Sequence, residues 1–244
     1  MTADPRVADL VQAGKIRVAI FLPQYAKDPA TGALRGIGMG FVAMEMGRAL
    51  AERLGVDLAV MENSTPVAAV QALKSGACDL GCLGIDPSRA AELDFTAPVV
   101  QFDYTLLVAD GAPIQTFADA DRPGKRIAVM LNHASTFALK RMAQHAELVG
   151  TELPEAAFDL LRRGQADAFA APRAQLLDYA EQLPRSRVLD AGYGVNNAGI
   201  AIRKGRTDRL AFMREFVEQA KTSGLIADII SRGGLRGFRV APNL

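Results

Sequence analysis

Apolar and polar positions alternate along this chain with two different periods, one typical of strands and one typical of helices. Short apolar runs that predict strands lie at 15–22, 57–61 and 80–85. Apolar residues at helical spacing between them predict helices over 40–54 and 66–75. Thr65 is a suitable N-cap for the second helix because its hydroxyl can accept a backbone N–H. This order of strand and helix predicts a parallel sheet with crossover helices.

The same alternation starts again after a predicted strand at 104–109 and a break at 110–113. This second block has predicted strands at 126–131 and 166–171 and predicted helices over 135–145, 155–163 and 174–181. A strand at 198–203 and helices over 209–223 and 225–232 follow. Two such blocks predict an α/β chain with two lobes, residues 1–106 plus 202–244 forming lobe 1 and residues 107–201 forming lobe 2. Ligands of such folds bind at the carboxyl ends of strands, in a crevice between the lobes.

Composition narrows the class of protein. The chain has 244 residues, half of them hydrophobic, which is enough for a sizeable core. Its 28 basic and 27 acidic residues give a net charge of +1 with no basic stripe, so nucleic acid is not an expected partner. No apolar run reaches the roughly 18 residues that a membrane-spanning helix needs.

The two cysteines, Cys78 and Cys82, flank one predicted strand. Four extended residues separate their Cα atoms by about 13 Å, which is too far for a disulfide. We therefore expect two buried free thiols. With two histidines in the whole chain, we expect no metal site and no cofactor.

Five segments then carry a resemblance over nearly the whole chain: GKIRVAIFLPQY, ALKSGACDLGCLGIDPSRAAELDFTAPV, LLRRGQADAFAA, AGIAIRKG and the region of Gly224. In this order and spacing they resemble the amino-acid-type periplasmic solute-binding proteins, family 3 of the bacterial solute-binding proteins. The resemblance implies the type II periplasmic binding protein fold, with two lobes, two crossover hinge strands and closure around a small solute. It also implies an ABC transporter permease as partner, a monomer, and no catalysis.

The resemblance assigns Arg89 to the carboxylate of the ligand, since a planar guanidinium matches two carboxylate oxygens. Gly84 stands where the family usually has Ser or Thr, so a backbone N–H replaces a hydroxyl there, and Ile85 follows it. Asp86 is expected to cap the turn at 87–91. The alternative for Arg89 is a surface ion pair with Glu92.

In lobe 2 the resemblance assigns ligand contacts to the loop before the predicted helix 135–145, formed by Asn132, His133, Ala134 and Ser135. A helix start offers free N–H groups and partial positive charge to an anion. The alternative is that Ser135 is simply the N-cap.

The informative departure from the family is Pro172. The family places an Asp there, which pairs with the α-ammonium of an amino acid, and a buried ammonium without a partner is costly. We therefore expect a small carboxylate but doubt an α-amino requirement. Arg173 either adds a second positive group or pairs with Asp178.

Phe21 and Tyr25 follow the first strand, where the family often has an aromatic wall over the ligand, although both also suit the lobe core. Asn197 is expected to point into the hinge cleft. Two other functions stay open: a cyclohexadienyl dehydratase-like enzyme and a stand-alone ligand sensor.

Localisation follows from the resemblance more than from the residues. Ala3 and Asp4 resemble a mature N-terminus after leader cleavage, which predicts the periplasm. If Met1 is the true start, the protein is cytoplasmic.

Overall fold

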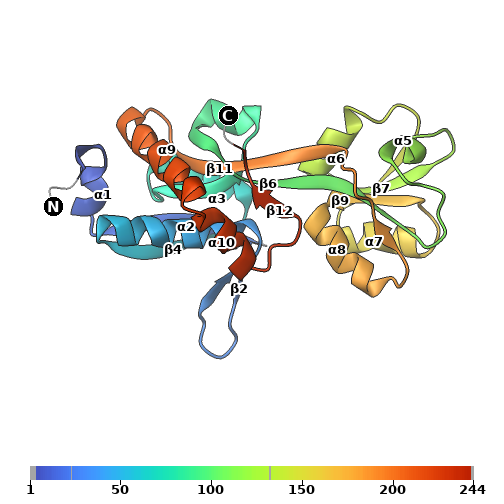
Figure 1. Ribbon diagram of the computed structural model, residues 1–244, viewed down its shortest axis with the longest axis horizontal. Helices are drawn as coiled ribbons and strands as arrows, with labels where there is room; N and C mark the ends of the chain where they lie inside the picture. Colours follow the sequence, from blue (N-terminus) through green and yellow to red (C-terminus); the bar gives the residue numbers. More distant parts are fainter. Residues whose placement is uncertain (1–3, 23, 132, 243–244) are drawn as a thin grey trace. The chain divides into compact units, whose positions relative to one another are not determined.

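The computed structural model describes residues 4–22, 24–131 and 133–242. Contacts between Cα atoms divide the chain into two units. Unit 1 comprises Met1–Gln101, Asn197–Leu235 and Arg239–Leu244, and unit 2 comprises Phe102–Asn196 and Arg236–Phe238. The chain crosses from unit 1 to unit 2 within the long strand β6 (Leu93–Val108) and returns within β11 (Gly194–Arg203) (Figure 1). Both crossing points lie a few residues from the lobe boundaries expected from the sequence.

The elements of unit 1 begin with a short helical segment and a helix that the periodicity did not predict. They are η1 (Pro5–Val7), α1 (Ala8–Gln12), β1 (Lys15–Phe21), β2 (Tyr25–Lys27), β3 (Leu34–Gly36), α2 (Met39–Leu54), β4 (Asp57–Asn63), α3 (Pro66–Ser75), β5 (Leu80–Gly84) and α4 (Pro87–Glu92). After β11 the chain adds α9 (Thr207–Thr222), α10 (Leu225–Arg232) and, across the last unit boundary, β12 (Phe238–Val240).

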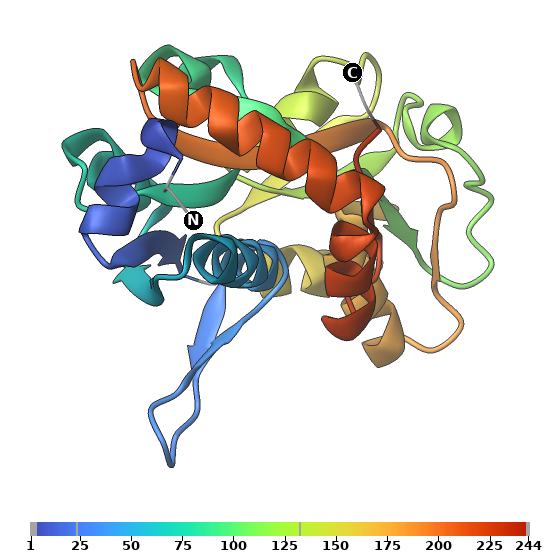
Figure 2. The same cartoon turned by 60° about the vertical axis from the view of Figure 1, so that its left-hand side comes forward.

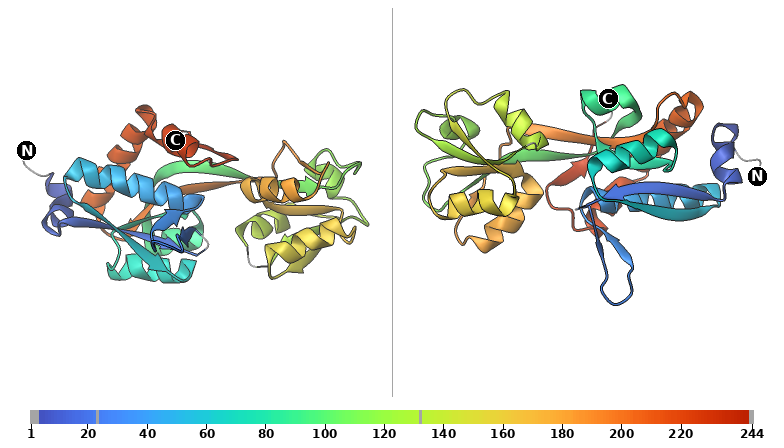
Figure 3. Two further views of the ribbon diagram at one scale, coloured as in Figure 1. Left: turned by 90° about the horizontal axis from the view of Figure 1, so that it is seen from below. Right: turned by 180° about the vertical axis from the view of Figure 1, so that it is seen from behind.

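The sheet of unit 1 confirms the parallel arrangement expected for the first block. Its order is β4-β1-β5-β11, in which β1 is parallel to β4 and β5, and β11 is antiparallel to β5. Neighbouring residues of β1 face opposite sides of the sheet. Val18 lies against Gly47 of α2, and Ala19 belongs to a cluster with Ala69 and Leu73 of α3. The two helices therefore cover opposite faces of the strands, as the left view of Figure 3 shows.

A β-hairpin of unit 1 was missing from the sequence prediction. Strands β2 and β3 pair antiparallel, with Tyr25 opposite Gly36 and Lys27 opposite Leu34. The hairpin extends away from the other elements of unit 1 (Figure 2). Lys27 forms an ion pair with Glu62 of β4 at 2.9 Å. Three-residue strands give too short a pattern for periodicity to detect.

Unit 2 contains the remaining elements. They are α5 (Phe117–Ala120), β7 (Arg126–Met130), α6 (Ala134–Lys140), β8 (Glu147–Thr151), α7 (Pro154–Arg162), β9 (Ala168–Pro172), α8 (Arg173–Gln182) and β10 (Arg187–Val188). The sheet order is β6-β9-β7-β8, with β7 parallel to both β8 and β9 and β6 antiparallel to β9.

The predicted helix 135–145 is too long, and the strand after it was missed. Helix α6 ends at Lys140. The carboxylate of Asp121 then accepts backbone N–H groups of Gln144, His145 and Ala146 at 2.8–3.2 Å. These hydrogen bonds hold the chain in a turn after α6, and β8 then pairs with β7. The periodicity could not show a carboxylate more than twenty residues away.

The two cysteines are buried free thiols, as expected. Cys82 lies in β5 and is 2% exposed, and burial raises the pKa of its thiol to about 12. Because the thiolate is the reactive form, this side chain is chemically inert in the folded state.

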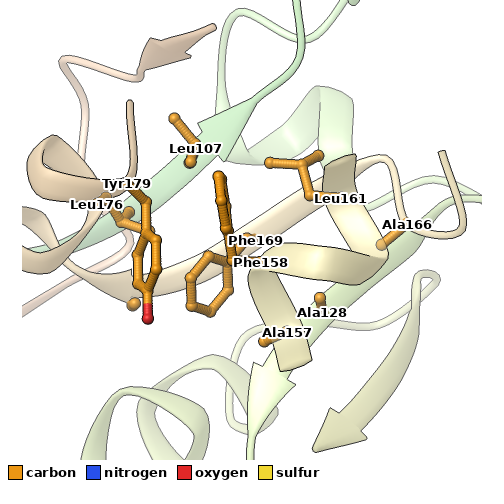
Figure 4. Packing of buried hydrophobic residues seen from close by; sticks show 10 residues of the cluster. Leu107, Ala128, Ala157, Phe158, Leu161, Ala166, Phe169, Leu176 and Tyr179 are labelled. Carbon is orange, nitrogen blue, oxygen red and sulfur yellow. The ribbon is translucent and has the colours of Figure 1, made fainter. Parts of the chain in front are cut away.

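A cluster of buried hydrophobic residues in unit 2 contains three aromatic rings (Figure 4). Phe169 of β9 is fully buried, and its ring meets that of Tyr179 edge-on with 5.7 Å between centroids. Phe158 of α7 stacks on the same tyrosine at 4.6 Å. Helices α7 and α8 are thus held on one face of β9.

We expect Phe169→Ala to lower the free energy of unfolding by about 3–5 kcal/mol, because the lost ring leaves a cavity that rigid neighbours cannot fill. Urea unfolding followed by circular dichroism measures this change. Phe137→Ala is the matched control: the same side chain in the same unit is 49% exposed and should cost less than about 1 kcal/mol. Equal losses for both variants would contradict the packing described.

Candidate functional site

Arg89 lies in α4, directly after the carboxyl end of β5. Its Nη1 donates to the carbonyl oxygen of Gly84 at 2.9 Å, and its Nε lies 3.3 Å from the Asp86 carboxylate. Its side chain is 32% exposed. Among the described residues, Nη2 has no hydrogen-bond partner. The guanidinium is therefore held in place by two contacts and still has N–H groups for an acceptor.

Asp86 is the N-cap of α4, as expected, and accepts the N–H of Arg89 at 3.0 Å. Burial alone would raise the pKa of Asp86. Hydrogen bonds from Ser88 and from the Arg89 N–H, together with the guanidinium charge, outweigh burial and lower that pKa. The carboxylate is therefore ionised near neutral pH, and an anionic ligand would compete with it for Arg89.

The alternative pairing of Arg89 with Glu92 is wrong. Glu92 forms an ion pair with Lys74 of α3 instead. Since α4 is a single short helix that starts at Pro87, Arg89 is close to its cap residue, and Asp86 competes successfully for the guanidinium.

Ile85 and Asn197 are brought together in unit 1. The Ile85 N–H donates to the Asn197 carbonyl at 2.7 Å. Both residues line a cavity of about 480 Å³ whose other described walls are Phe95, Thr96, Ala97, Pro98, Gln101, Arg214 and Pro242. Sequence reasoning missed Gln101 and Arg214, because nothing in the pattern separates them from other polar residues of a strand and an amphipathic helix.

The aromatic residues after β1 have different surroundings. Phe21 is half-buried and packs against the cluster that β1 forms with α3. Tyr25 lies in the hairpin, where partial burial and a hydrogen bond to Glu62 raise the pKa of its hydroxyl. Neither belongs to the walls of the cavity just described.

In unit 2, His133 is the N-cap of α6. Its Nδ1 accepts the N–H of Ser135 at 3.2 Å and lies 2.7 Å from the Ser135 hydroxyl. A nitrogen that accepts these bonds carries no proton, so the neutral ring has its proton on Nε2. Burial lowers the pKa of His133, which favours the same neutral form.

The donors at the start of α6 are already largely used. The Ser135 N–H bonds the His133 ring, and the N–H groups of Thr136 and Phe137 donate to the His133 carbonyl. Ala134 is the first residue of the helix, Ser135 is fully buried, and Asn132 lies outside the described residues. Among the described groups of this loop, the N–H of Ala134 and the Nε2–H of His133 have no hydrogen-bond partner and are free to donate to a ligand.

His133 stands at one end of a row of aromatic rings in unit 2. Its ring meets Tyr104 of β6 edge-on with 6.5 Å between centroids, and Tyr104 stacks on Tyr193 at 6.1 Å. Tyr193 in turn lies 5.9 Å from Phe117 of α5. This aromatic row fixes the orientation of the imidazole.

Pro172 ends β9 opposite Tyr104, and α8 starts at Arg173. The guanidinium of Arg173 donates to the carbonyls of Leu189 and Asp190 at 3.0 and 2.6 Å and lies 3.6 Å from the Asp103 carboxylate. Its expected pairing with Asp178 is wrong, because Asp178 pairs with Arg236. Arg173 therefore joins α8 to the segment before β11.

Within the described ranges, no three His, Cys, Asp or Glu side chains are grouped closely enough to hold a metal ion. Of the helices described, none has the length and apolar character needed to cross a bilayer.

Comparison with known proteins gives consistent relatives. Residues 29–232 match the profile of bacterial extracellular solute-binding proteins, family 3. A glutamine-binding protein of Geobacillus stearothermophilus is 25% identical over 180 residues, which cover 73% of this chain and 67% of that protein. The virulence sensor protein BvgS of Bordetella pertussis is 25% identical over 191 residues, but these are 15% of its length.

Solved structures agree with the fold. An ancestral cationic amino acid solute-binding protein, AncCDT-1, has a TM-score of 0.73 and 26% identity, covering 93% of this chain and 98% of its own. A binding component of an ABC transporter from Wolinella succinogenes, complexed with lysine, has a TM-score of 0.72 at 23% identity and covers 90% and 95% of the two chains.

We expect the stability of the fold to fall between pH 7.5 and 5.5 because of His133. With a folded pKa below the ordinary value near 6.5, the unfolded chain binds the proton first, so stability is present above pH 6.5 and is lost below it. His133→Asn keeps an N-cap side chain and should remove this part of the loss. Urea unfolding at both pH values measures it.

His145→Asn is the control, since that histidine is exposed and should leave the loss unchanged. An equal loss in the wild type and in His133→Asn would show that the imidazole of His133 is not kept neutral by the fold.

Proposed function

The chain belongs to family 3 of the bacterial extracellular solute-binding proteins, and from this premise we propose that it binds a small carboxylate for an ABC-type importer. The proposal places the protein outside the cytoplasm, in the periplasm, with a permease as partner. Binding without catalysis is the proposed activity.

One observation supports a carboxylate as the ligand: the Arg89 guanidinium is fixed just after the end of a buried strand and has N–H groups without a partner among the described residues. The Gly84 carbonyl and the Asp86 carboxylate hold the guanidinium on one side. Its Nη2, which has no partner among the described residues, supports a bond to a solute oxygen, and a charged donor makes such a bond stronger than a neutral one. A solute that displaces the Asp86 carboxylate from Arg89 loses part of the binding energy that this bond provides. This cost favours a solute that is fully ionised at neutral pH.

Pro172 bears on the rest of the solute. It offers no side-chain acceptor, and the nearby charge of Arg173 is neutralised by Asp103 and two carbonyls. Unit 2 thus lacks a carboxylate at 172 for an α-ammonium. We propose that an organic acid, or an amino acid held without an ion pair there, is the solute.

His133 supports the same chemistry. A neutral imidazole with its proton on Nε2 is a donor, which suits a carboxylate or a carbonyl oxygen and repels an ammonium less than a cation would. The ring needs no reorganisation because Ser135 and Tyr104 already orient it.

An enzyme is the second candidate, because one solved neighbour is described as a precursor of cyclohexadienyl dehydratase. A carboxyl group that acts as a general acid at neutral pH needs a raised pKa. The described Asp and Glu side chains with a shifted pKa are all shifted downward, as in Asp86, Asp167 and Glu62. Binding is therefore favoured, and turnover of a cyclohexadienyl acid would reverse this preference. The match to BvgS makes sensing the third candidate.

We expect Arg89→Gln to weaken binding of the solute by at least about tenfold, or 1.4 kcal/mol, because the charged donor is lost. A thermal-shift screen of organic acids and amino acids identifies solutes first; one present at 100 times its Kd adds about 2.7 kcal/mol of stability. Titration calorimetry then compares the variants.

Arg35→Gln is the matched control, since it removes one exposed arginine of unit 1 and should leave affinity unchanged. A solute bound equally well by Arg89→Gln would contradict the role of Arg89.

We expect deaminated acids to bind at least as well as the α-amino acids with the same side chain, because 172 offers no partner for the ammonium. Pairs such as a keto acid and its amino acid, titrated side by side, measure the preference. A clear preference for the amino acids would show that another acceptor binds the ammonium.

A further inference from the structure

The cavity of unit 1 that Ile85 and Asn197 line is a second candidate site. Its volume of about 480 Å³ falls within the range of roughly 300–1,000 Å³ that is typical of small-molecule pockets. Arg89 is not one of its described lining residues. The cavity includes the points where the chain leaves and re-enters unit 1, since Gln101 of β6 is the last residue before unit 2 and Asn197 of β11 is the first residue after it.

Several polar groups of the cavity already bond one another. The Thr96 hydroxyl donates to the Ala97 carbonyl at 2.8 Å and accepts the N–H of Ile200 at 3.1 Å. Nε2 of Gln101 donates to Oδ1 of Asn197 at 2.6 Å, and Oε1 of Gln101 accepts from Nε of Arg239 at 3.2 Å. The side-chain acceptors of Gln101 and Asn197 are thus engaged.

The side-chain polar groups of the described walls that remain without a partner are donors. Within the described part of the chain, Nδ2 of Asn197 donates to no group, and the guanidinium of Arg214 on α9 forms neither a hydrogen bond nor an ion pair. No acidic side chain is among the described walls. A cationic fork and an amide N–H without acceptors select an anion.

The other walls are apolar: Ile85, Phe95, Ala97, Pro98 and Pro242. They suit the body of a small aromatic or branched aliphatic molecule. We propose that this cavity binds a small monocarboxylate with an apolar body, whose oxygens accept from Arg214 and from Nδ2 of Asn197. This site goes beyond the proposed solute site, because Arg214 and not Arg89 holds the anion, although Ile85 and Asn197 are residues expected at both sites.

Nuclear magnetic resonance tests the proposal with 4-fluorophenylacetate as the probe. We expect saturable broadening of its fluorine signal and a shift of the Ile85 methyl signal in isoleucine-labelled protein, assigned through Ile85→Val. The neutral 4-fluorophenylacetamide has the same ring without the charge and should bind at least tenfold more weakly. Equal binding of the amide would contradict an anion site.

Variants separate the two sites. Arg214→Gln and Asn197→Asp should each raise the Kd of the probe at least tenfold; the second keeps the acceptor for Gln101 but replaces the free donor by a negative charge. Arg35→Gln and Arg89→Gln should leave it within twofold. Methyl spectra and melting temperatures verify that each variant is folded.

The outcomes distinguish this site from the proposed function. Loss of the probe in Arg89→Gln but not in Arg214→Gln would overturn the second site and leave the Arg89 site standing. Absence of an Ile85 shift at 10 mM probe would also overturn it. Arg214→Gln should still bind the solute found in the thermal-shift screen with wild-type affinity.

Discussion

The buried carboxylate of Asp79, the residue before β5, fixes the position of β5 in unit 1 and thereby that of the residues that follow this strand. Asp79 is 4% exposed and accepts the backbone N–H of Arg17 at 2.9 Å and two N–H groups of its guanidinium at 2.9 and 2.7 Å. These bonds fix β5 against β1 in one register, Val18 opposite Leu80. Because β5 has five residues, the same register places Gly84, and so the carbonyl that holds Arg89. A slip of one residue would turn every side chain of β5 to the other face.

Much of this fold could be predicted because long segments with a regular spacing of apolar residues indicate their secondary structure directly. Helices 66–75 and 225–232 have the predicted bounds, and the cap at Thr65 accepts the Ala68 N–H as expected. What escaped prediction depends on distant partners. Strand β8 needs the Asp121 carboxylate to turn the chain, and β10 has only two residues, which pair with β6. Such elements are stabilised by tertiary contacts rather than by local pattern.

The candidate site was harder to predict than the fold. The capping of α4 by Asp86 was predictable, because Asp86 and Arg89 lie on one short turn where spacing determines contact. The ligand contact of Arg89 came from the resemblance and stays a prediction. Sequence reasoning did not predict that the Arg173 guanidinium donates to the carbonyls of Leu189 and Asp190, since these residues approach α8 only after the chain has folded back. It also missed Arg214. Whether a guanidinium has hydrogen-bond or ion-pair partners depends on the residues around it in the folded chain and not on its position in a helix.

The division of unit 1 between distant parts of the chain determines the order in which this protein can be completed. Strand β5 needs β11 as its neighbour, with Gly84 opposite Ala198, more than one hundred residues later. Unit 2 is almost entirely one continuous stretch, Phe102–Asn196. During folding, therefore, the continuous unit 2 can form before unit 1 is complete, and strand β5 keeps one unpaired edge until β11 joins it. Such an edge is prone to aggregate while it stays unpaired.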